Sequence, residues 1–186
     1  MNGSKWRREV AESMREIVFG LEDSFVSTLG AVTGIAAGAD STYIVIMSGL
    51  VIVAVEAVSM AAGSYLSNKS ATEAEREVLR EEGKVAATGA HTHLIRSAAV
   101  MGVFYVLGGF VPLAPYFFLP IRNAYAPSII LTAFCLFALG AWSASFSKRS
   151  PWRGGAQMAV ISLSAAAIGF VIGRLVGAYY GVVPGM

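Results

Sequence analysis

The chain has 186 residues, of which 55% are hydrophobic and only 14% are charged, and its mean hydropathy is +0.62. Soluble domains carry about 25% charged residues, so this composition argues against a soluble protein and for one that lies in a membrane. The net charge of +2 does not indicate a nucleic-acid partner.

Long apolar segments dominate the sequence. A bilayer core of about 30 Å needs roughly 20 apolar residues in a helix, and five segments meet this length approximately. We therefore expect an all-α integral membrane protein with one domain, residues 1–186. Its five expected spans are 17–39, 43–66, 97–118, 126–146 and 155–180.

The basic residues predict how these spans are oriented, because cytoplasmic loops of membrane proteins carry an excess of Lys and Arg. Twelve of the 14 basic residues lie before span one, between spans two and three, or between spans four and five. Five spans place these segments on one side, so we expect a cytoplasmic N-terminus and an external or lumenal C-terminus. Arg122 is the exception, and Arg174 lies inside span five.

The N-terminal segment 4–16, SKWRREVAESMRE, places Trp6, Val10 and Met14 on one helical face. This pattern predicts a short amphipathic helix at the cytoplasmic interface. A helical lead-in that only anchors span one is an equally good interpretation.

Two adjacent acids, Glu22 and Asp23, lie in span one. An ionisable residue within a span is costly, and it is usually functional or paired. At about 100° per residue, Asp23 lies within about 20° of Gly30 and Gly34, whereas Glu22 points about 100° away. We expect Asp23 to be the buried acid and Glu22 to have a lesser role near the headgroups. Arg174 is about 28 Å deep and Asp23 only about 9 Å, so we do not expect them to pair.

Glycines recur every four residues in spans one and five. Such stripes let helix backbones approach closely in lipid, either within one chain or across a dimer. The glycines are Gly30, Gly34, Gly38, Gly169, Gly173 and Gly177.

Span two carries Glu56 and Met60, four residues apart and therefore on one face. The short connection after span one makes the two spans antiparallel neighbours, so Met60 lies at about the depth of Asp23 and Glu56 one turn deeper. Carboxylates favour hard cations, and a thioether shifts the preference towards transition metals such as Fe²⁺. Protons would compete with the metal for the carboxylates, which is the basis of an antiporter. Taken alone, Met60 is more simply a packing residue.

The link 67–96 is the only substantial segment outside the expected spans. Thr72 and Glu75 fit a capping box, so we expect a short cytoplasmic helix to about Lys84. Glu and Arg or Lys follow each other at a spacing of three, which is typical of a solvated, salt-bridged helix. Alternatively, this acidic surface gathers cations. Candidate residues for cytoplasmic metal entry are Glu81, Glu82, His91 and His93, although such histidines are more often ordinary loop residues.

Span three ends in GGFVPLAPYFF, where Pro112 and Pro115 disturb the helix. Such clusters mark either a moving part of a transporter or a simple kink. We expect the following LPIRNAYAP to form a tight external turn. Cys135 is the only cysteine, so no disulfide forms within the chain, and a buried apolar role is expected for it.

Three motifs resemble the vacuolar iron transporter family: REIVFGLEDSF at 15–25, SMAAGSYLS at 59–67 and GGFVPLAPYFF at 108–118. The resemblance implies a homodimer with the ion path at its interface. It also implies export of cytosolic Fe²⁺, sometimes Mn²⁺, into a vacuole or out of the cell in exchange for protons. The family's span-one Asp corresponds to Asp23, and its span-two Met corresponds to Met60.

This chain departs from the family pattern in three ways. Ser24 stands where the family usually has Gly. Ile52 stands where some members have an acid, and our hypothesis is that Glu56 replaces that acid on the same face. The link has about 30 residues, whereas metal-binding members carry a longer three-helix cytoplasmic domain with Glu and Met ligands. Glu81 and Glu82 resemble only the start of that domain, which makes metal storage there doubtful.

These patterns lead to one main hypothesis, a dimeric transporter that moves Fe²⁺ or Mn²⁺ out of the cytoplasm against protons. Asp23, Glu56 and Met60 would form its site, with Glu22 as a further ligand, no resident cofactor and no nucleic-acid partner. We expect the cell membrane in a prokaryote and the vacuolar membrane in a eukaryote. The alternative is a membrane scaffold or sensor whose acids serve helix association. No nucleophile or HExxH spacing indicates an enzyme.

Overall fold

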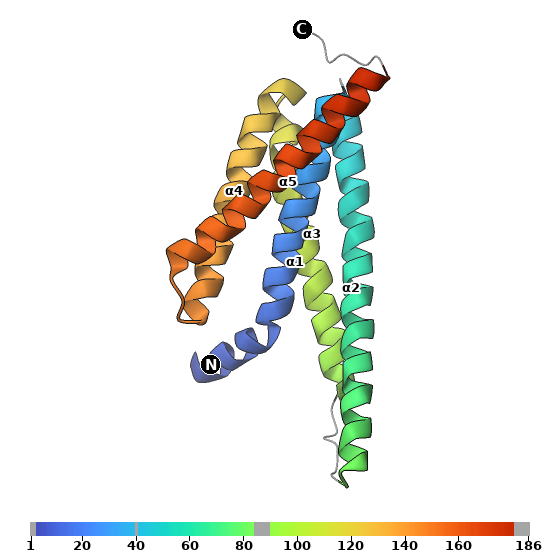
Figure 1. The fold of residues 1–186 in the computed structure, drawn as a ribbon, viewed down its shortest axis with the longest axis vertical. Coiled ribbons are helices and arrows are strands. Elements are labelled where there is room, and N and C mark those ends of the chain that lie inside the picture. The colour runs from blue at the N-terminus through green and yellow to red at the C-terminus, as the bar shows by residue number, and fades with distance from the viewer. Residues whose placement is uncertain (1–2, 40, 84–89, 181–186) are drawn as a thin grey trace.

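The computed structural model describes the backbone of residues 3–39, 41–83 and 90–180, and the side chains of these residues except 3–12 and 90–92. It contains five α-helices in these ranges (Figure 1). Their bounds are α1 Gly3–Gly38, α2 Thr42–Glu81, α3 Ala90–Phe118, α4 Ile121–Phe146 and α5 Pro151–Tyr179. The all-α fold class predicted from the sequence is therefore confirmed.

Four helices in the described part of the chain are long and apolar enough to cross a membrane: Thr42–Glu81, His93–Phe118, Ile121–Phe146 and Pro151–Tyr179. The expected first span lies within α1, which is long enough but less apolar. α1 contacts each of the other four helices, and hydroxyl side chains such as Ser24, Thr28 and Thr33 are buried on it. A helix that packs mainly on protein does not need the apolar surface of one that faces lipid.

Backbone contact between α1 and α5 explains the two glycine stripes. A Cβ atom added to Gly34 would lie 2.7 Å from the carbonyl oxygen of Gly169, and one on Gly38 would lie 3.0 Å from that of Gly173. A Cβ on Gly169 would collide with the carbonyl oxygen of Gly30. Gly177, one turn further along α5, is also buried. The stripes therefore pack against each other within one chain.

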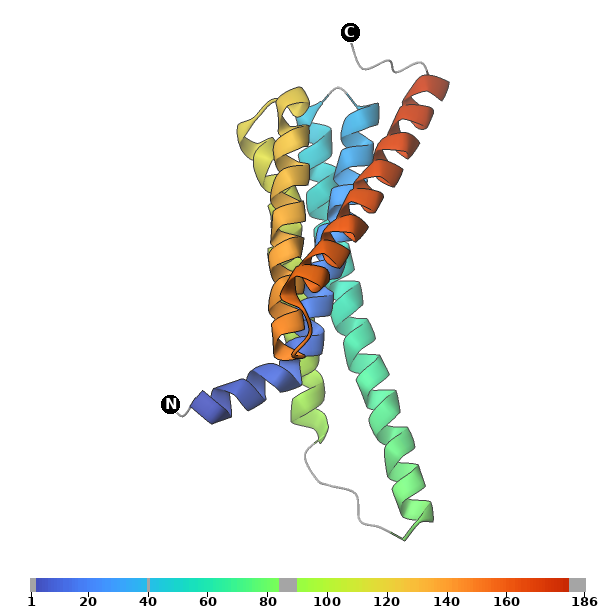
Figure 2. The same cartoon turned by 60° about the vertical axis from the view of Figure 1, so that its left-hand side comes forward.

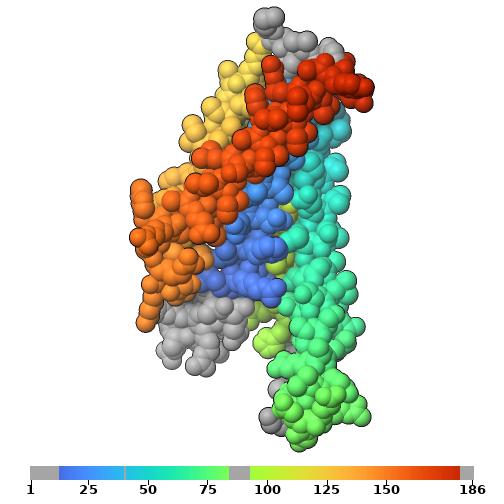
Figure 3. Space-filling view, viewed as in Figure 1, coloured from blue at the N-terminus to red at the C-terminus, as the bar shows by residue number. Residues whose placement is uncertain are grey.

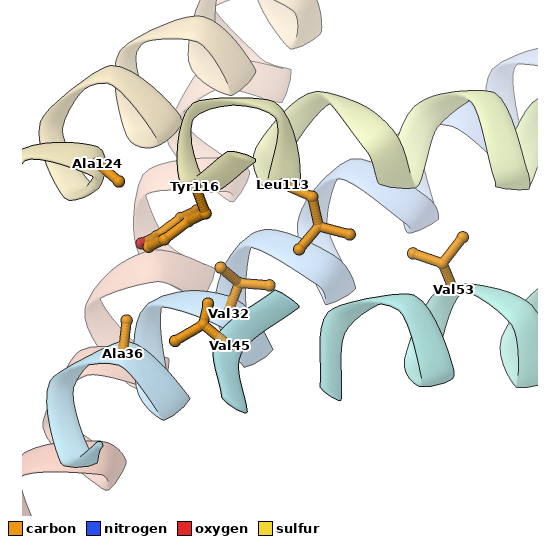
Figure 4. Close-up of a cluster of buried hydrophobic side chains, with 7 residues drawn as sticks. All are labelled: Val32, Ala36, Val45, Val53, Leu113, Tyr116 and Ala124. Atoms are coloured by element: carbon orange, nitrogen blue, oxygen red, sulfur yellow. The ribbon is translucent and has the colours of Figure 1, made fainter. Parts of the chain in front are cut away.

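A cluster of buried hydrophobic side chains packs α1, α2, α3 and α4 together near the short α1–α2 and α3–α4 connections (Figure 4). Its members are Val32, Ala36, Val45, Val53, Leu113, Tyr116 and Ala124. Outside this core, many large apolar side chains of α2 to α5 are exposed, including Val58 at 71% and Phe134 at 68%. Such an apolar exterior suits a bilayer and does not suit water.

The link differs from its prediction, because α2 runs without interruption to Glu81. Thr72 does not cap a new helix: its hydroxyl donates to the carbonyl oxygen of Asn68 at 2.8 Å, the bond of a residue inside a helix. The separate short helix and its capping box are therefore wrong. No Gly or Pro stands between Ser64 and Glu82 to end α2. Surface pairs Lys69–Glu73 and Glu77–Arg80, each 3.8 Å apart, line this end of α2.

The N-terminal segment is likewise part of a longer element. Residues 4–16 are the first turns of α1 and not a separate short helix, and these turns bend away from the rest of α1 (Figures 1 and 2). The side chains of Trp6 and Val10, which define the predicted amphipathic face, lie outside the described residues, whereas Met14 is half-buried.

The prolines of α3 do not break it. α3 stays helical through Pro112 and Pro115 to Phe118, and the hydroxyl of Ser128 on α4 donates to the carbonyl oxygen of Pro112 at 2.7 Å. Only Leu119 and Pro120 separate α3 from α4. The connection is therefore shorter than the predicted turn, and α4 begins five residues before the expected start at 126.

Candidate functional site

Two carboxylates from neighbouring helices approach each other inside the bundle. Asp23 on α1 and Glu56 on α2 are both partly buried, and they are close enough for their charges to interact. Among the described residues, neither has a Lys, Arg or His ion-pair partner. The arrangement therefore places two negative groups together without a protein cation to neutralise them.

Hydroxyl groups hold one of these carboxylates in place. The Tyr105 hydroxyl on α3 donates to Oε2 of Glu56, and the Ser27 hydroxyl donates to the same oxygen at 3.0 Å. The Ser27 and Tyr105 hydroxyls are themselves 2.7 Å apart, and because each has one proton, a hydroxyl that donates to the other cannot donate to Glu56 at the same time. Tyr105 is fully buried, so three helices together fix the Glu56 side chain.

Ser24 explains how α1 and α3 come close enough for this network. Its hydroxyl donates to the carbonyl oxygen of Tyr105 at 2.5 Å. On α3, a Cβ added to Gly108 would lie 3.0 Å from the Ser24 Cβ, and one added to Gly109 would collide with Val53. Gly108 and Gly109 thus make room for Ser24. Ser24 stands where the family that the sequence resembles usually has Gly.

The other predicted ligands lie at different distances from this pair. Met60 is half-buried one helical turn from Glu56 on α2, on the same face. Glu22 instead lines a cavity of about 200 Å³ between α1, α4 and α5, with Arg149 and Met158 among its other walls. Glu22 and Asp23 therefore point to different parts of the molecule, although the charges of these adjacent residues still interact.

The described structure does not bring the residues predicted for cytoplasmic metal entry close to one another. Glu81 ends α2 and is exposed, and Glu82 follows it. His91 and His93 lie in the first turns of α3 and not in a loop; His93 is exposed, and the side chain of His91 lies outside the described residues. The end of α2 and the start of α3 are separated (Figure 2).

Two residues that contact Glu56, Ser27 and Tyr105, and one further buried acid of α1, Glu16, were not predicted from the sequence. Ser27 lies four residues after Asp23, a spacing that could have found it, whereas nothing in the sequence turns Tyr105 towards Glu56. Glu16 lies seven residues before Asp23, on nearly the same face of α1. It is only 6% exposed, and its Oε2 atom has no hydrogen-bond partner among the described residues.

The chemistry of the site is that of a cation or proton site. Carboxylate and hydroxyl oxygens bind hard and borderline cations, and the Met60 thioether adds a soft donor within one turn. Within the described residues, no group of three or more His, Cys, Asp or Glu could hold a metal ion. One chain therefore offers two charged ligands, fewer than divalent metals commonly take.

A groove leads along α1 beside this site. It has a volume of about 700 Å³ and is lined by Ser27, by the glycine stripes and by apolar residues of α1 and α5. Figure 3 shows α1 uncovered between α5 and α2 on this face. The least apolar helix of the bundle is thus exposed on one side of the single chain.

The chain is similar to several proteins that are named vacuolar iron transporters. It is 27% identical to vacuolar iron transporter 1 of Eucalyptus grandis, covering 89% of this chain and 87% of the relative. It is 26% identical to vacuolar iron transporter 1 of Arabidopsis thaliana, covering 89% and 86%. An uncharacterised protein of Methanocaldococcus jannaschii is 28% identical, covering 85% and 87%.

The lengths of these alignments differ. The two plant alignments have 216 positions although they cover only 89% of these 186 residues, so the plant relatives carry inserted residues that this chain lacks. The archaeal alignment has 167 positions.

A sequence model of the VIT family matches residues 14–92 and 77–174, two pieces that overlap in the link. The chain therefore belongs to the VIT family, which confirms the resemblance seen in its sequence motifs.

Proposed function

We propose that this protein is a five-span membrane transporter that moves Fe²⁺, with Mn²⁺ as a second substrate, out of the cytoplasm in exchange for protons. The observation that carries the proposal is the Asp23–Glu56 pair, two partly buried carboxylates that have no cationic partner among the residues described by the structure. Two like charges in a membrane are strongly unfavourable unless a cation or proton joins them. The pair is thus suited to alternate between a metal-bound and a protonated state.

The choice of metal rests on the ligands and on the relatives. Met60, one turn from Glu56, adds a soft donor to an oxygen site and favours a transition metal over Mg²⁺ or Ca²⁺. The plant relatives are named vacuolar iron transporters. Exchange for protons is proposed because carboxylates bind either a metal or protons, so loading one releases the other.

The proposal counts α1 as the fifth span. α1 lies among the four apolar helices and reaches from one end of the bundle to the other (Figure 1). An odd number of spans would separate the termini, and the proposal is supported by the start of α1 and the end of α5, which lie at opposite ends of the bundle (Figure 1). The distribution of Lys and Arg then favours a cytoplasmic N-terminus.

A second copy of the chain is the proposed cover for the exposed side of α1. Contact with lipid would be unfavourable for the half-buried Asp23 and Ser27, because hydrocarbon offers them no hydrogen bonds. A symmetric dimer around this face would pair the two copies of α1 and bring four carboxylates near one axis. Such a doubled site supplies the ligands that one chain lacks for a divalent ion.

The test is metal flux into sealed liposomes that hold the purified protein, with and without an acidic interior. We expect Fe²⁺ uptake that rises with the proton gradient and is abolished by Asp23→Ala. Glu75→Gln, which removes an exposed acid of the link, is the matched control and should transport normally. Flux that ignores the gradient would indicate a channel and contradict proton exchange.

Asp23→Asn separates transport from the scaffold hypothesis. An amide can still bridge helices by hydrogen bonds, but it carries no charge for a metal and cannot exchange a proton. We expect this variant to form the same oligomer, measured by crosslinking, and to be inactive in flux. Normal flux by Asp23→Asn would refute the role of the Asp23 charge in transport, and no metal flux by the unmodified protein would refute the transporter and favour the scaffold.

A further inference from the structure

A second large cavity lies at the end of the bundle where α1 ends and α4 begins, away from the carboxylate pair. It has a volume of about 710 Å³, is open on one side and is lined by the last turns of α1, the first turns of α4 and the part of α5 from Leu163 onward. α4 and α5 touch where they are joined, since a Cβ on Gly140 would collide with Gly154. Towards the other end they diverge (Figures 1 and 2), and the cavity occupies this opening.

Two arginines stand at this cavity. Arg122 lies in the first turn of α4 and Arg174 near the end of α5, and both line the cavity and are exposed. These are the two basic residues that the positive-inside pattern left unexplained, and the fold brings them together although 52 positions separate them in sequence. Among the described residues, neither has a carboxylate partner, and no lining residue is acidic.

The rest of the cavity wall changes from polar to apolar. Tyr125, one turn after Arg122 in α4, lines the cavity and interacts electrostatically with Arg174. Deeper walls are apolar, with Ile129, Leu163 and Phe170 among them. Thr33 on α1 also lines the cavity. It is only 1% exposed, and its hydroxyl has no hydrogen-bond partner among the described residues.

We propose that this cavity binds an anionic phospholipid from the leaflet opposite the cytoplasm. The two guanidinium groups suit the phosphodiester, because Arg matches phosphate oxygens with paired hydrogen bonds. The apolar walls take the upper part of an acyl chain. A free anion would leave the apolar volume empty, and an uncharged lipid would leave the arginines without a partner.

The placement in the outer or lumenal leaflet rests on the topology proposed above, but lipid binding itself does not depend on the metal site. A lipid held here would fill the opening between α4 and α5, which protein side chains leave unfilled. It would also supply the negative charge that the described part of this end lacks. Failure of metal transport would therefore leave this proposal standing, and the reverse also holds.

Lipid-dependent thermal unfolding of the detergent-purified chain tests the proposal. The probes are phosphatidylglycerol, phosphatidylcholine and the soluble anion glycerol 3-phosphate. We expect phosphatidylglycerol to raise the unfolding midpoint most and glycerol 3-phosphate to have no effect. Equal stabilisation by both lipids would reduce the site to an apolar crevice, and an equal effect of glycerol 3-phosphate would point to a free anion; either result overturns the proposal.

Variants locate the effect in the cavity. Arg122→Gln combined with Arg174→Gln should weaken phosphatidylglycerol binding about tenfold or more, since each removes charged hydrogen bonds. The control Arg153→Gln removes an exposed arginine at the other end of α5 and should bind like the unmodified chain. The lipid-free midpoint and elution volume of the double variant show whether it is folded.

Thr33→Val keeps the shape of the side chain and removes the unpaired hydroxyl. It should unfold at a higher temperature without lipid, because an unsatisfied buried hydroxyl is lost, and should bind phosphatidylglycerol like the unmodified chain, because that hydroxyl is closed off from the cavity. Unchanged phosphatidylglycerol affinity in the double arginine variant would show that the lipid binds elsewhere.

Discussion

At the scale of single residues, the candidate site combines charge that could be read from the sequence with a frame that could not. Asp23 and Glu56 follow from helical angles and depth, because an α-helix fixes which residues share a face. Tyr105 could not be found in this way. α3 is apolar on nearly every side, so its sequence does not say which face turns to Glu56.

Tyr105→Phe tests whether this frame matters. The substitution removes one hydroxyl from a fully buried side chain and leaves Glu56 with one fewer donor. Loss of a hydrogen bond to a charged group costs about 1.5–3 kcal/mol, so we expect a lower unfolding midpoint and a several-fold lower rate of metal flux. Tyr43→Phe, on a tyrosine that is 71% exposed, is the control. If Tyr105→Phe behaves like this control, the hydroxyl network has no role at the site.

At the scale of elements, hydrophobicity predicted where helices end but not how they continue. The expected ends at 39, 118, 146 and 180 fall within one residue of the observed ends of α1, α3, α4 and α5. The prediction of a separate helix in the link 67–96 was wrong, because Thr72 and Glu75 satisfy the capping-box pattern equally well inside a helix. A capping box stops a preceding helix only if a breaker stands beside it, and here none does.

Thr72→Ala distinguishes a continuous α2 from two helices. Loss of an N-cap would destabilise the protein by about 1 kcal/mol. Inside a helix, alanine is at least as favourable as threonine, so we expect an unchanged or slightly higher unfolding midpoint. The measurement is thermal unfolding followed by circular dichroism, and a clear drop in the midpoint would restore the separate helix.

Close contact between α1 and α5 gives a prediction with a built-in control. Gly169→Ala places a methyl group against the backbone of Gly30, and overpacking of this kind costs about 1–3 kcal/mol. Gly63 on α2 is exposed and has nothing within 4 Å of an added Cβ. Gly63→Ala should therefore stabilise by about 0.5–1 kcal/mol. Opposite shifts in the unfolding midpoint are expected, and equal shifts would refute the packing.

At the scale of the whole molecule, the positive-inside pattern predicts that the α3–α4 and α4–α5 connections lie on opposite sides. The single Cys135 makes this simple to test, since Cys135→Ser removes the only native thiol. On that background, Asn123→Cys should react with a membrane-impermeant maleimide from outside intact cells. Ser150→Cys should react only after the membrane is opened. Labelling of both from outside would exclude the proposed topology.

The arrangement of the helices was only partly predictable. The apolar runs predicted the five long helices in their observed order, because each run depends on local composition, but the two short helices predicted beside them are parts of α1 and α2. That α1 contacts all four other helices, and that its glycines meet those of α5, depends on tertiary packing. The stripe of Gly30, Gly34 and Gly38 would suit a helix of the same chain or of a second copy, and only the fold shows the contact with α5.

One consequence follows from the uninterrupted course of α2. Glu56 and the charged end at Glu81 belong to one rigid rod, about 38 Å apart at 1.5 Å per residue. A tilt of about 10° around Glu56 would swing that end by about 6 Å, with the same geometry. A small tilt of α2 would therefore move its projecting end much further than it moves the carboxylates. A spin label at Glu77 would report that displacement.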